Sequence, residues 1–307
     1  MKNKIIDLHT HTNISDGVLT PIQLAERAVK MGIEVISITD HDSVGAYSEE
    51  LLGFCKLQKI EIIPGIEFST VDDNGFKYHV VGLFIDLNSS MLADTVERLK
   101  LKRLEILNKT IEKIGADNLS VDQSYLEGIK NTVTKAHISR SILKSKSNKE
   151  WLIKEFGHVP TEGELIEKFM LKGQKYYVDS NFEFTPKQAI DTIRASGGLS
   201  FLAHPSFYVE KGENINKLVE KFIQYGVDGI EVFSLTFDRS NNDKEVNLVE
   251  QFYKICEEKD LLMSGGSDFH TSSKDEIGNF VELGFIGTDI KFEENQLNKI
   301  RNRRNHL

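Results

Sequence analysis

The sequence predicts an α/β protein: a barrel-like core of β-strands and helices interrupted by a helical insertion. Short runs rich in Ile and Val alternate with helical patterns through the first ninety residues, and the alternation returns from about residue 185. Between them, leucines and valines recur at helical spacing with charges in between. We therefore expect a discontinuous core of residues 1–89 and 184–307, with residues 90–183 forming a helical cap.

The first part of the core is predicted to contain two helices and four strands. Thr20 and Pro21 combine a capping hydroxyl with a proline suited to the first helical position, and Gly32 ends that helix. The predicted strands are residues 5–8, 33–38, 60–63 and 78–85, and the second helix spans about 46–57. This rhythm favours parallel strand–helix–strand units.

The second part repeats the same signals. Thr185 and Pro186 begin another helix, which Gly197 and Gly198 close. Strands are predicted at residues 199–203, 229–233 and 261–264, with helices at about 214–225 and 241–259.

Composition narrows the class of protein. The chain has 307 residues, of which 39% are hydrophobic, and no apolar run approaches the roughly 20 residues that span a bilayer. Cys55 and Cys256 are its only cysteines, which fits a reducing compartment, and we expect a cytoplasmic protein. The net charge of −9 gives no general attraction for nucleic acid, so duplex DNA is not an expected partner. The oligomeric state is not indicated.

Histidines and carboxylates gather at the predicted strand ends. His9 and His11 follow the first strand, and alternate residues of a strand point to the same side. The carboxyl ends of parallel barrel strands meet at one face, so side chains at several such ends share one mouth. The candidate metal ligands are His9, His11, Asp16, His41, Glu67, His79, His204, Asp268 and His270.

This ligand set indicates divalent metal ions. Imidazole with carboxylate suits manganese, iron or zinc and is poor for calcium. Nine ligands are too many for one ion, so we expect two or three ions bridged by a carboxylate, with manganese favoured. Each motif alone has a plain structural explanation, such as a helix cap or an Asx turn. Their coincidence at successive strand ends favours a metal centre.

The motifs resemble those of the PHP family, the polymerase and histidinol phosphatase family. The resemblance covers about residues 4–87 and 185–287 and implies a distorted seven-stranded (β/α) barrel with three metal ions. It rests on His9-x-His11-x4-Asp16-Gly17, Thr39-Asp40-His41-Asp42, Pro64-Gly65-Ile66-Glu67, Ala203-His204-Pro205 and Ser267-Asp268-x-His270. In the insertion, Ala136-His137-Ile138-Ser139-Arg140 resembles the branch of 3′,5′-nucleoside bisphosphate phosphatases and a 5′-to-3′ exonuclease acting on short RNA.

The resemblance also implies how the ligands divide. One ion would take His9, His11, Glu67 and Asp268; a second would share Glu67 and take His79 and His204; the third would take Asp16, His41 and His270. Either His137 or His204 completes the second site, and the sequence leaves this open.

The resulting prediction is a metal-dependent phosphoesterase acting on a small phosphorylated nucleotide or on short RNA. A hydroxide bridging the ions would attack phosphorus in line. His137 would protonate the leaving alcohol or hydrogen-bond the phosphate, and Arg140 would hold phosphate oxygens. Lysines surround these two residues, which is also typical of a solvated helix face: Lys135, Lys144, Lys146 and Lys149.

Three alternatives remain open at this point. The first is a small-metabolite phosphatase, such as one for histidinol phosphate, and the second is a non-catalytic metal-binding regulatory module. The third is amide hydrolysis, since metal-activated water serves carbonyl and phosphoryl centres alike. The complete ligand set argues against the regulatory module, and the resemblance favours phosphorus.

Overall fold

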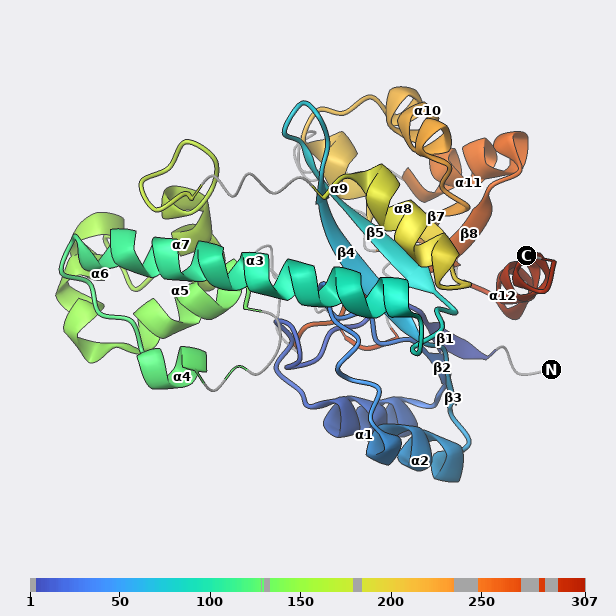
Figure 1. Cartoon of the computed structure of the whole chain (residues 1–307), viewed down its shortest axis with the longest axis horizontal. Coiled ribbons are helices and arrows are strands. Elements are labelled where there is room, and N and C mark those ends of the chain that lie inside the picture. The colour runs from blue at the N-terminus through green and yellow to red at the C-terminus, as the bar shows by residue number, and fades with distance from the viewer. Residues whose placement is uncertain are drawn as a thin grey trace.

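Two β-sheets form the core of the computed structural model (Figure 1), which describes residues 4–127, 129, 133–178, 184–234, 248–271, 282–284 and 292–306. The smaller sheet is parallel, in the order β1 (Ile5–Asp7), β2 (Ile33–Ile36), β3 (Glu61–Ile62). The larger runs β4 (Gly65–Val71), β5 (Lys77–Leu83), β6 (Leu199–Leu202), β7 (Gly229–Phe233), β8 (Leu262–Gly265). The predicted mixed α/β core is confirmed.

The two sheets meet along both edges. The Leu8 amide donates to the Gly265 carbonyl at 3.1 Å, which joins the segment after β1 to β8. On the other side, His41 forms a parallel bridge with Glu67 of β4. The described residues thus hold eight strands in two joined sheets, where the sequence predicted seven in one barrel. Pro64, which has no N–H for a β-ladder, lies between β3 and β4.

β4 and β5 differ from the predicted parallel pattern. They form an antiparallel hairpin, and β5 is also antiparallel to β6. The Asp72 carboxylate accepts hydrogen bonds from the Asn74 and Phe76 amides, and Gly75 takes the positive φ that this turn needs. The sequence prediction missed β4 because its buried carboxylate looked like a strand end rather than a strand interior.

Helices cover the outer faces of the two sheets. α1 (Pro21–Met31) and α2 (Glu49–Gln58) pack with the smaller sheet, and Thr20 caps α1 by accepting from the Gln23 amide, as predicted. Thr185 caps α8 in the same way. The larger sheet has α8 (Pro186–Ala195), α9 (Pro205–Glu210), α10 (Ile215–Tyr225), α11 (Leu248–Lys259) and α12 (Glu294–Arg304). Residues 241–247 of the predicted 241–259 helix lie outside the described residues.

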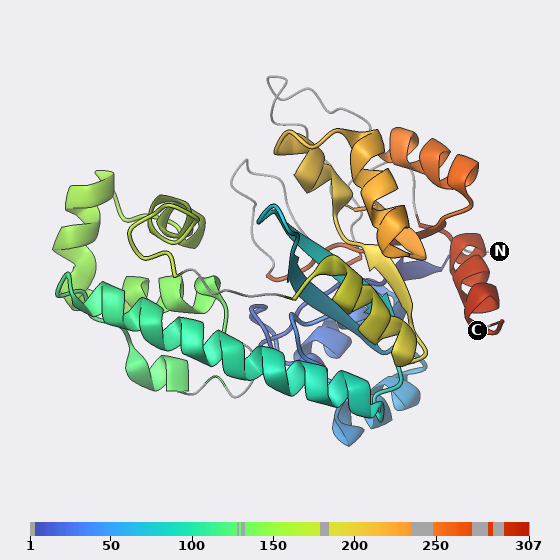
Figure 2. The same cartoon turned by 45° about the horizontal axis from the view of Figure 1, so that its top comes forward.

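The described part of residues 90–183 is largely helical. α3 (Ser90–Gly115) runs from the sheets to a group of shorter helices (Figures 1 and 2). That group, called the cap helices below, comprises α4 (Gln123–Glu127), α5 (Lys135–Lys144), η1 (Lys146–Asn148), α6 (Lys149–Phe156) and α7 (Glu162–Phe169). Buried side chains from Leu107 to Tyr176 form a hydrophobic cluster of their own there.

Among the helices within the described ranges, none has the length and apolar content needed to cross a membrane.

Candidate metal centre

All nine predicted ligands come together where the two sheets meet. His9 and His11 follow β1, His41 follows β2, and Glu67 and His79 lie in β4 and β5. His204 follows β6, Asp16 lies in the loop before α1, and Asp268 and His270 follow β8. His204 and Asp268 have positive φ values of 30° and 52°, a strained backbone that recurs at functional sites.

The first group of ligand atoms surrounds Nε2 of His11. This atom lies 3.2 Å from Glu67 Oε2, 3.2 Å from Asp268 Oδ1 and 3.1 Å from His9 Nε2. His9 Nε2 in turn lies 3.4 Å from Glu67 Oε1 and 3.3 Å from Asp268 Oδ1. Four side chains whose ligand atoms lie at these separations can hold one ion between them.

The second group surrounds the other Glu67 oxygen. His79 Nδ1 and His204 Nε2 each lie 3.1 Å from Glu67 Oε1, and they lie 3.1 Å from each other. His137 makes other contacts: its Nδ1 accepts a hydrogen bond of 3.1 Å from the Thr134 amide at the start of α5. The geometry therefore favours His204 over His137 as the third ligand of this group.

The third group is built on Asp16. His270 Nε2 lies 3.3 Å from Asp16 Oδ1, and His41 Nε2 lies 3.7 Å from Asp16 Oδ2. His41 also turns its Nδ1 toward Glu67 Oε2, at 2.9 Å. His11 adds its Nδ1 at 3.7 Å from Asp16 Oδ1, so His11 and His41 connect this group to the other two.

Unpaired buried atoms test whether this set fits a metal ion. Asp16 Oδ1, His41 Nδ1 and Glu67 Oε2 are buried and have no hydrogen-bond partner among the described residues. His41 Nδ1 and Glu67 Oε2 are close but not aligned for a hydrogen bond. Leaving such atoms unsatisfied is costly, and cations bound in these groups would give them partners. The donor chemistry and the geometry both fit divalent metal ions.

The charges in the cluster support the same conclusion. Burial lowers the pKa of His11, but the neighbouring carboxylates of Asp268 and Glu67 outweigh it and raise that pKa to about 10. Burial raises the pKa of Glu67, but the charges of His41, His79 and His9 hold it well below its usual range. The buried carboxylates thus favour positive charge at this place, and bound metal ions would supply it.

Acidic residues outside the predicted ligand set orient the ligands. His9 Nδ1 lies 2.7 Å from Glu231 Oε2, a contact that fixes which ring nitrogen faces the metal site. Asp7 accepts from the amide and hydroxyl of Ser267 beside Asp268. Glu231 and Asp7 were not among the predicted site residues. The feature that could have pointed to them is that each is a carboxylate within an otherwise apolar strand.

Arg140 lies beside the centre and is bonded to protein groups. Its Nε donates to both carboxylate oxygens of Glu162, at 2.7 and 2.9 Å, and its Nη2 donates to the Asp16 carbonyl at 3.0 Å. Arg140 thereby ties α5 to the loop that carries a metal ligand.

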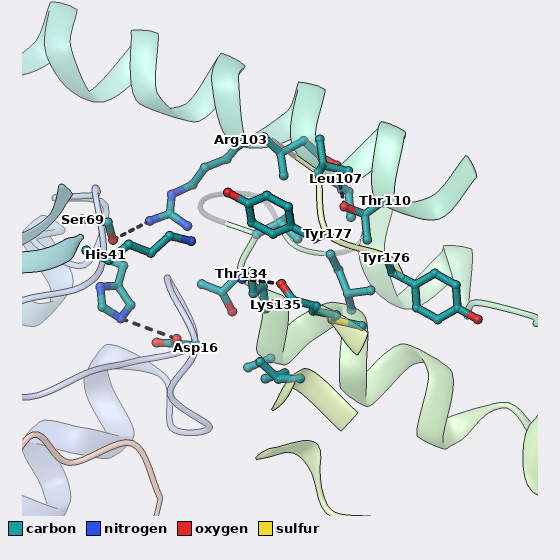
Figure 3. Close-up of a pocket in the computed structure, with 18 of the residues that line it drawn as sticks. Asp16, His41, Ser69, Arg103, Leu107, Thr110, Thr134, Lys135, Tyr176 and Tyr177 are labelled. Carbon is teal, nitrogen blue, oxygen red and sulfur yellow. Dashed lines mark hydrogen bonds and ion pairs between the residues drawn. The ribbon is translucent and has the colours of Figure 1, made fainter. Parts of the chain in front are cut away.

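Basic side chains also line a cavity between the metal centre and the cap helices (Figure 3). Lys77 of β5, Arg103 of α3 and Lys135 of α5 are part of its wall, and only Lys135 belonged to the predicted basic stretch. Arg103 donates to the Asp42 carboxylate and to the Ser69 hydroxyl, so α3 is fixed to the core next to the ligands.

The protein thus combines a mixed α/β fold with a buried cluster of histidines and carboxylates, as metal-dependent hydrolases do. The chain belongs to the PHP domain family, whose match spans residues 7–193.

Curated relatives align with most of the chain. It is 33% identical to the 5′-3′ exoribonuclease of Escherichia coli over 273 residues, covering 87% of this chain and 85% of that protein. It is 30% identical to the 5′-3′ exoribonuclease of Haemophilus influenzae, covering 87% and 90%. It is 26% identical to the 3′,5′-nucleoside bisphosphate phosphatase of Chromobacterium violaceum, covering 86% and 87%.

Solved structures share the fold. A Bifidobacterium adolescentis protein described as a metal-dependent phosphoesterase superposes with a TM-score of 0.75 at 22% identity, covering 97% of this chain and 96% of that one. A Chromobacterium violaceum protein described as an amidohydrolase gives 0.72 at 24% identity, covering 97% and 96%.

Proposed function

We propose that the protein is a metal-dependent phosphoesterase that hydrolyses phosphate esters of nucleotides. The observation that carries this proposal is the convergence of nine imidazole and carboxylate side chains in overlapping groups, several of which share Glu67, with buried ligand atoms that lack partners. Its relatives named above act, by their names, on RNA from the 5′ end or on nucleoside bisphosphates. Short RNA is the preferred substrate class, because the relatives that are at least 30% identical over most of the chain are exoribonucleases.

Three divalent ions, with manganese favoured, would occupy the three groups of ligands. His9, His11, Glu67 and Asp268 would hold one ion, and Glu67, His79 and His204 a second. Asp16, His41 and His270 would hold the third. The short distances from both Glu67 oxygens to neighbouring histidines support a bridging role for that carboxylate.

When bound, the ions would supply an activated water and neutralise charge on the phosphoryl group. The chain's own part is to orient the ligands and receive the substrate. His137 is a neutral imidazole, because burial lowers its pKa to about 4 and its Nδ1 accepts from Thr134. Its role in the proposal is therefore to donate a hydrogen bond from Nε2 to phosphate, rather than to deliver a proton.

Arg140 keeps its proposed place beside phosphate. Its guanidinium is held by Glu162, whose side chain is partly exposed, so a phosphate would replace or share that partner. In this account Arg140→Ala raises KM for 3′,5′-bisphosphoadenosine and for an aryl phosphate alike, because Arg140 holds the phosphate at the metal centre. Steady-state kinetics with manganese checks this, and unchanged KM values for both substrates would remove Arg140 from the binding site.

We also propose a strand count for the barrel and a role for the helical insertion. β3 and β4 count as one strand interrupted at Pro64, which gives a distorted seven-stranded barrel, and residues 90–183 form the cap. Both cysteines are unpaired and buried, which suits a cytoplasmic enzyme.

A panel of phosphate esters tests the function. Purified protein with manganese is offered a short 5′-phosphorylated RNA, 3′,5′-bisphosphoadenosine, histidinol phosphate and an aryl phosphate. Hydrolysis of the RNA or the bisphosphate, abolished in His11→Ala, supports the proposal. Turnover of histidinol phosphate alone would instead assign the protein to small metabolites. No turnover of any ester with metal bound would favour an amide substrate or a regulatory module.

A further inference from the structure

A cavity of about 360 Å³ opens from the metal centre toward the cap helices (Figure 3). Three candidate ligands, Asp16, His41 and His79, lie along it. Apolar side chains from α3, from α5 and from the segments beside α5 and α7 form another part of its wall: Ile106, Leu107, Val133, Ile138, Met170 and Tyr176. A molecule bound here would contact the metal centre and an apolar surface together.

Two lysines from different parts of the chain meet in this cavity. Lys77 comes from β5 of the core and Lys135 from the first turn of α5. The ammonium group of each lies 5.8 Å from the centre of the Tyr177 ring. Lys135 Nζ is positioned by a hydrogen bond of 2.7 Å to the Met170 carbonyl. The cavity therefore places two lysine amino groups around one aromatic ring.

Bringing two ammonium groups together in a partly buried place is unfavourable. Burial, and then the charge of Lys77, lower the pKa of Lys135 to about 7. An anion between the two lysines would remove this repulsion, and lysine is a common phosphate ligand. The two lysines would therefore bind a substrate that places a negative charge between them.

We propose that Lys77 and Lys135 bind a second, non-scissile phosphate of the substrate, while the adjoining nucleoside lies on Tyr177 and the apolar wall. This inference rests on the proposed function, because it takes the scissile phosphate to lie at the metal centre. The site lies apart from Arg140, which the sequence prediction placed beside phosphate. Arg140 and Lys144 line another cavity, with Tyr125 and Glu162.

A cationic pair shared by core and cap selects substrates by their number of phosphates. A nucleotide with two phosphates would engage the ions and the lysines at once, whereas a monoester would engage the ions alone. The pair adds binding energy away from the reacting atoms, so its loss should raise KM and leave kcat nearly unchanged.

The test compares Lys135→Met, Lys77→Met and Lys135→Arg with the wild type. The substrates are 3′,5′-bisphosphoadenosine, the adenosine 3′- and 5′-monophosphates, and an aryl phosphate, all with manganese. Each Met variant should raise KM for the bisphosphate about tenfold and leave the aryl phosphate unchanged, as expected for a lost charged hydrogen bond. Lys135→Arg should retain most of the preference. Lys109→Met is the matched control, since Lys109 is an exposed α3 lysine paired with Glu105.

The wild-type rates and the variant ratios answer separate questions. A wild type inactive on every nucleotide would refute the proposed function itself. An active wild type whose Met variants change KM equally for all substrates, or for none, would refute the lysine site alone. Calorimetric binding of the bisphosphate to metal-depleted protein provides a readout without turnover: Lys135→Met should weaken it and Lys109→Met should not. Equal affinity in both variants would contradict the proposal.

Discussion

At the residue scale, the contact between Glu231 and His9 orients a candidate ligand at the place where the two sheets meet. His9, His41 and Glu67 could be found in the sequence because each ends or follows a β-rich run beside other metal-binding residue types. Glu231 could not, because one carboxylate in an apolar strand carries no spacing signal. Its role depends on a contact with His9 that only the folded chain creates.

Glu231→Gln should weaken metal binding or activity by roughly 10–100-fold, the usual effect of removing a carboxylate that orients a ligating histidine. Manganese affinity measured by calorimetry, together with turnover of the preferred ester, checks this. Glu220→Gln, an exposed change on α10, is the control. Equal affinities in the two variants would show that the contact with His9 is not needed.

His137 should make stability depend on pH. Its folded-state pKa of about 4 lies below its ordinary value, so the unfolded chain binds the proton more readily. Neutral His137 therefore contributes to the free energy of unfolding above about pH 6.5. Roughly 2 kcal/mol of this contribution is lost as the pH falls toward 4. Urea unfolding of wild type and His137→Gln at several pH values, in a chelator, checks this. The difference between their free energies of unfolding should change across that range, and parallel profiles would rule the effect out.

At the element scale, helix starts were more predictable than strand directions. Thr20-Pro21 and Thr185-Pro186 act locally, and both threonines form the expected caps. The β4–β5 hairpin was not predicted, although Asn74-Gly75 is a typical turn sequence. The reason is that the strand before this turn was not recognised. Strand direction depends on pairing partners that are distant in sequence.

Arg103 is the element-scale contact that fixes α3 to the core. Its partner carboxylate, Asp42, is fully buried, so Arg103→Met should destabilise the protein by about 3 kcal/mol, because it leaves that charge uncompensated. Adding Asp42→Asn should recover much of the loss, although Asp42 also accepts from the Ser69 amide. Chemical denaturation of both single variants and the double variant measures the coupling. Additive losses would mean that the two residues act independently.

At the scale of the whole molecule, the metal centre is assembled from segments between residues 9 and 270. The sequence predicted this gathering because barrel strand ends converge on one face. The side-by-side placement of Lys77 and Lys135 was not predictable, since it depends on how the cap helices sit against β5. Tertiary packing also joined the strands into two sheets, which strand patterns alone do not specify.

The most direct test of the central claim is the number of manganese ions per chain at full activity. Metal-depleted protein is titrated with manganese while bound metal and hydrolysis of the preferred nucleotide ester are measured on the same samples. We predict that activity saturates at two or three bound ions. Glu67→Gln, which alters the carboxylate shared by the groups, should bind fewer ions and lose nearly all turnover. Full activity at one ion or none, or an unaltered Glu67→Gln variant, would contradict a multi-metal centre built on this carboxylate.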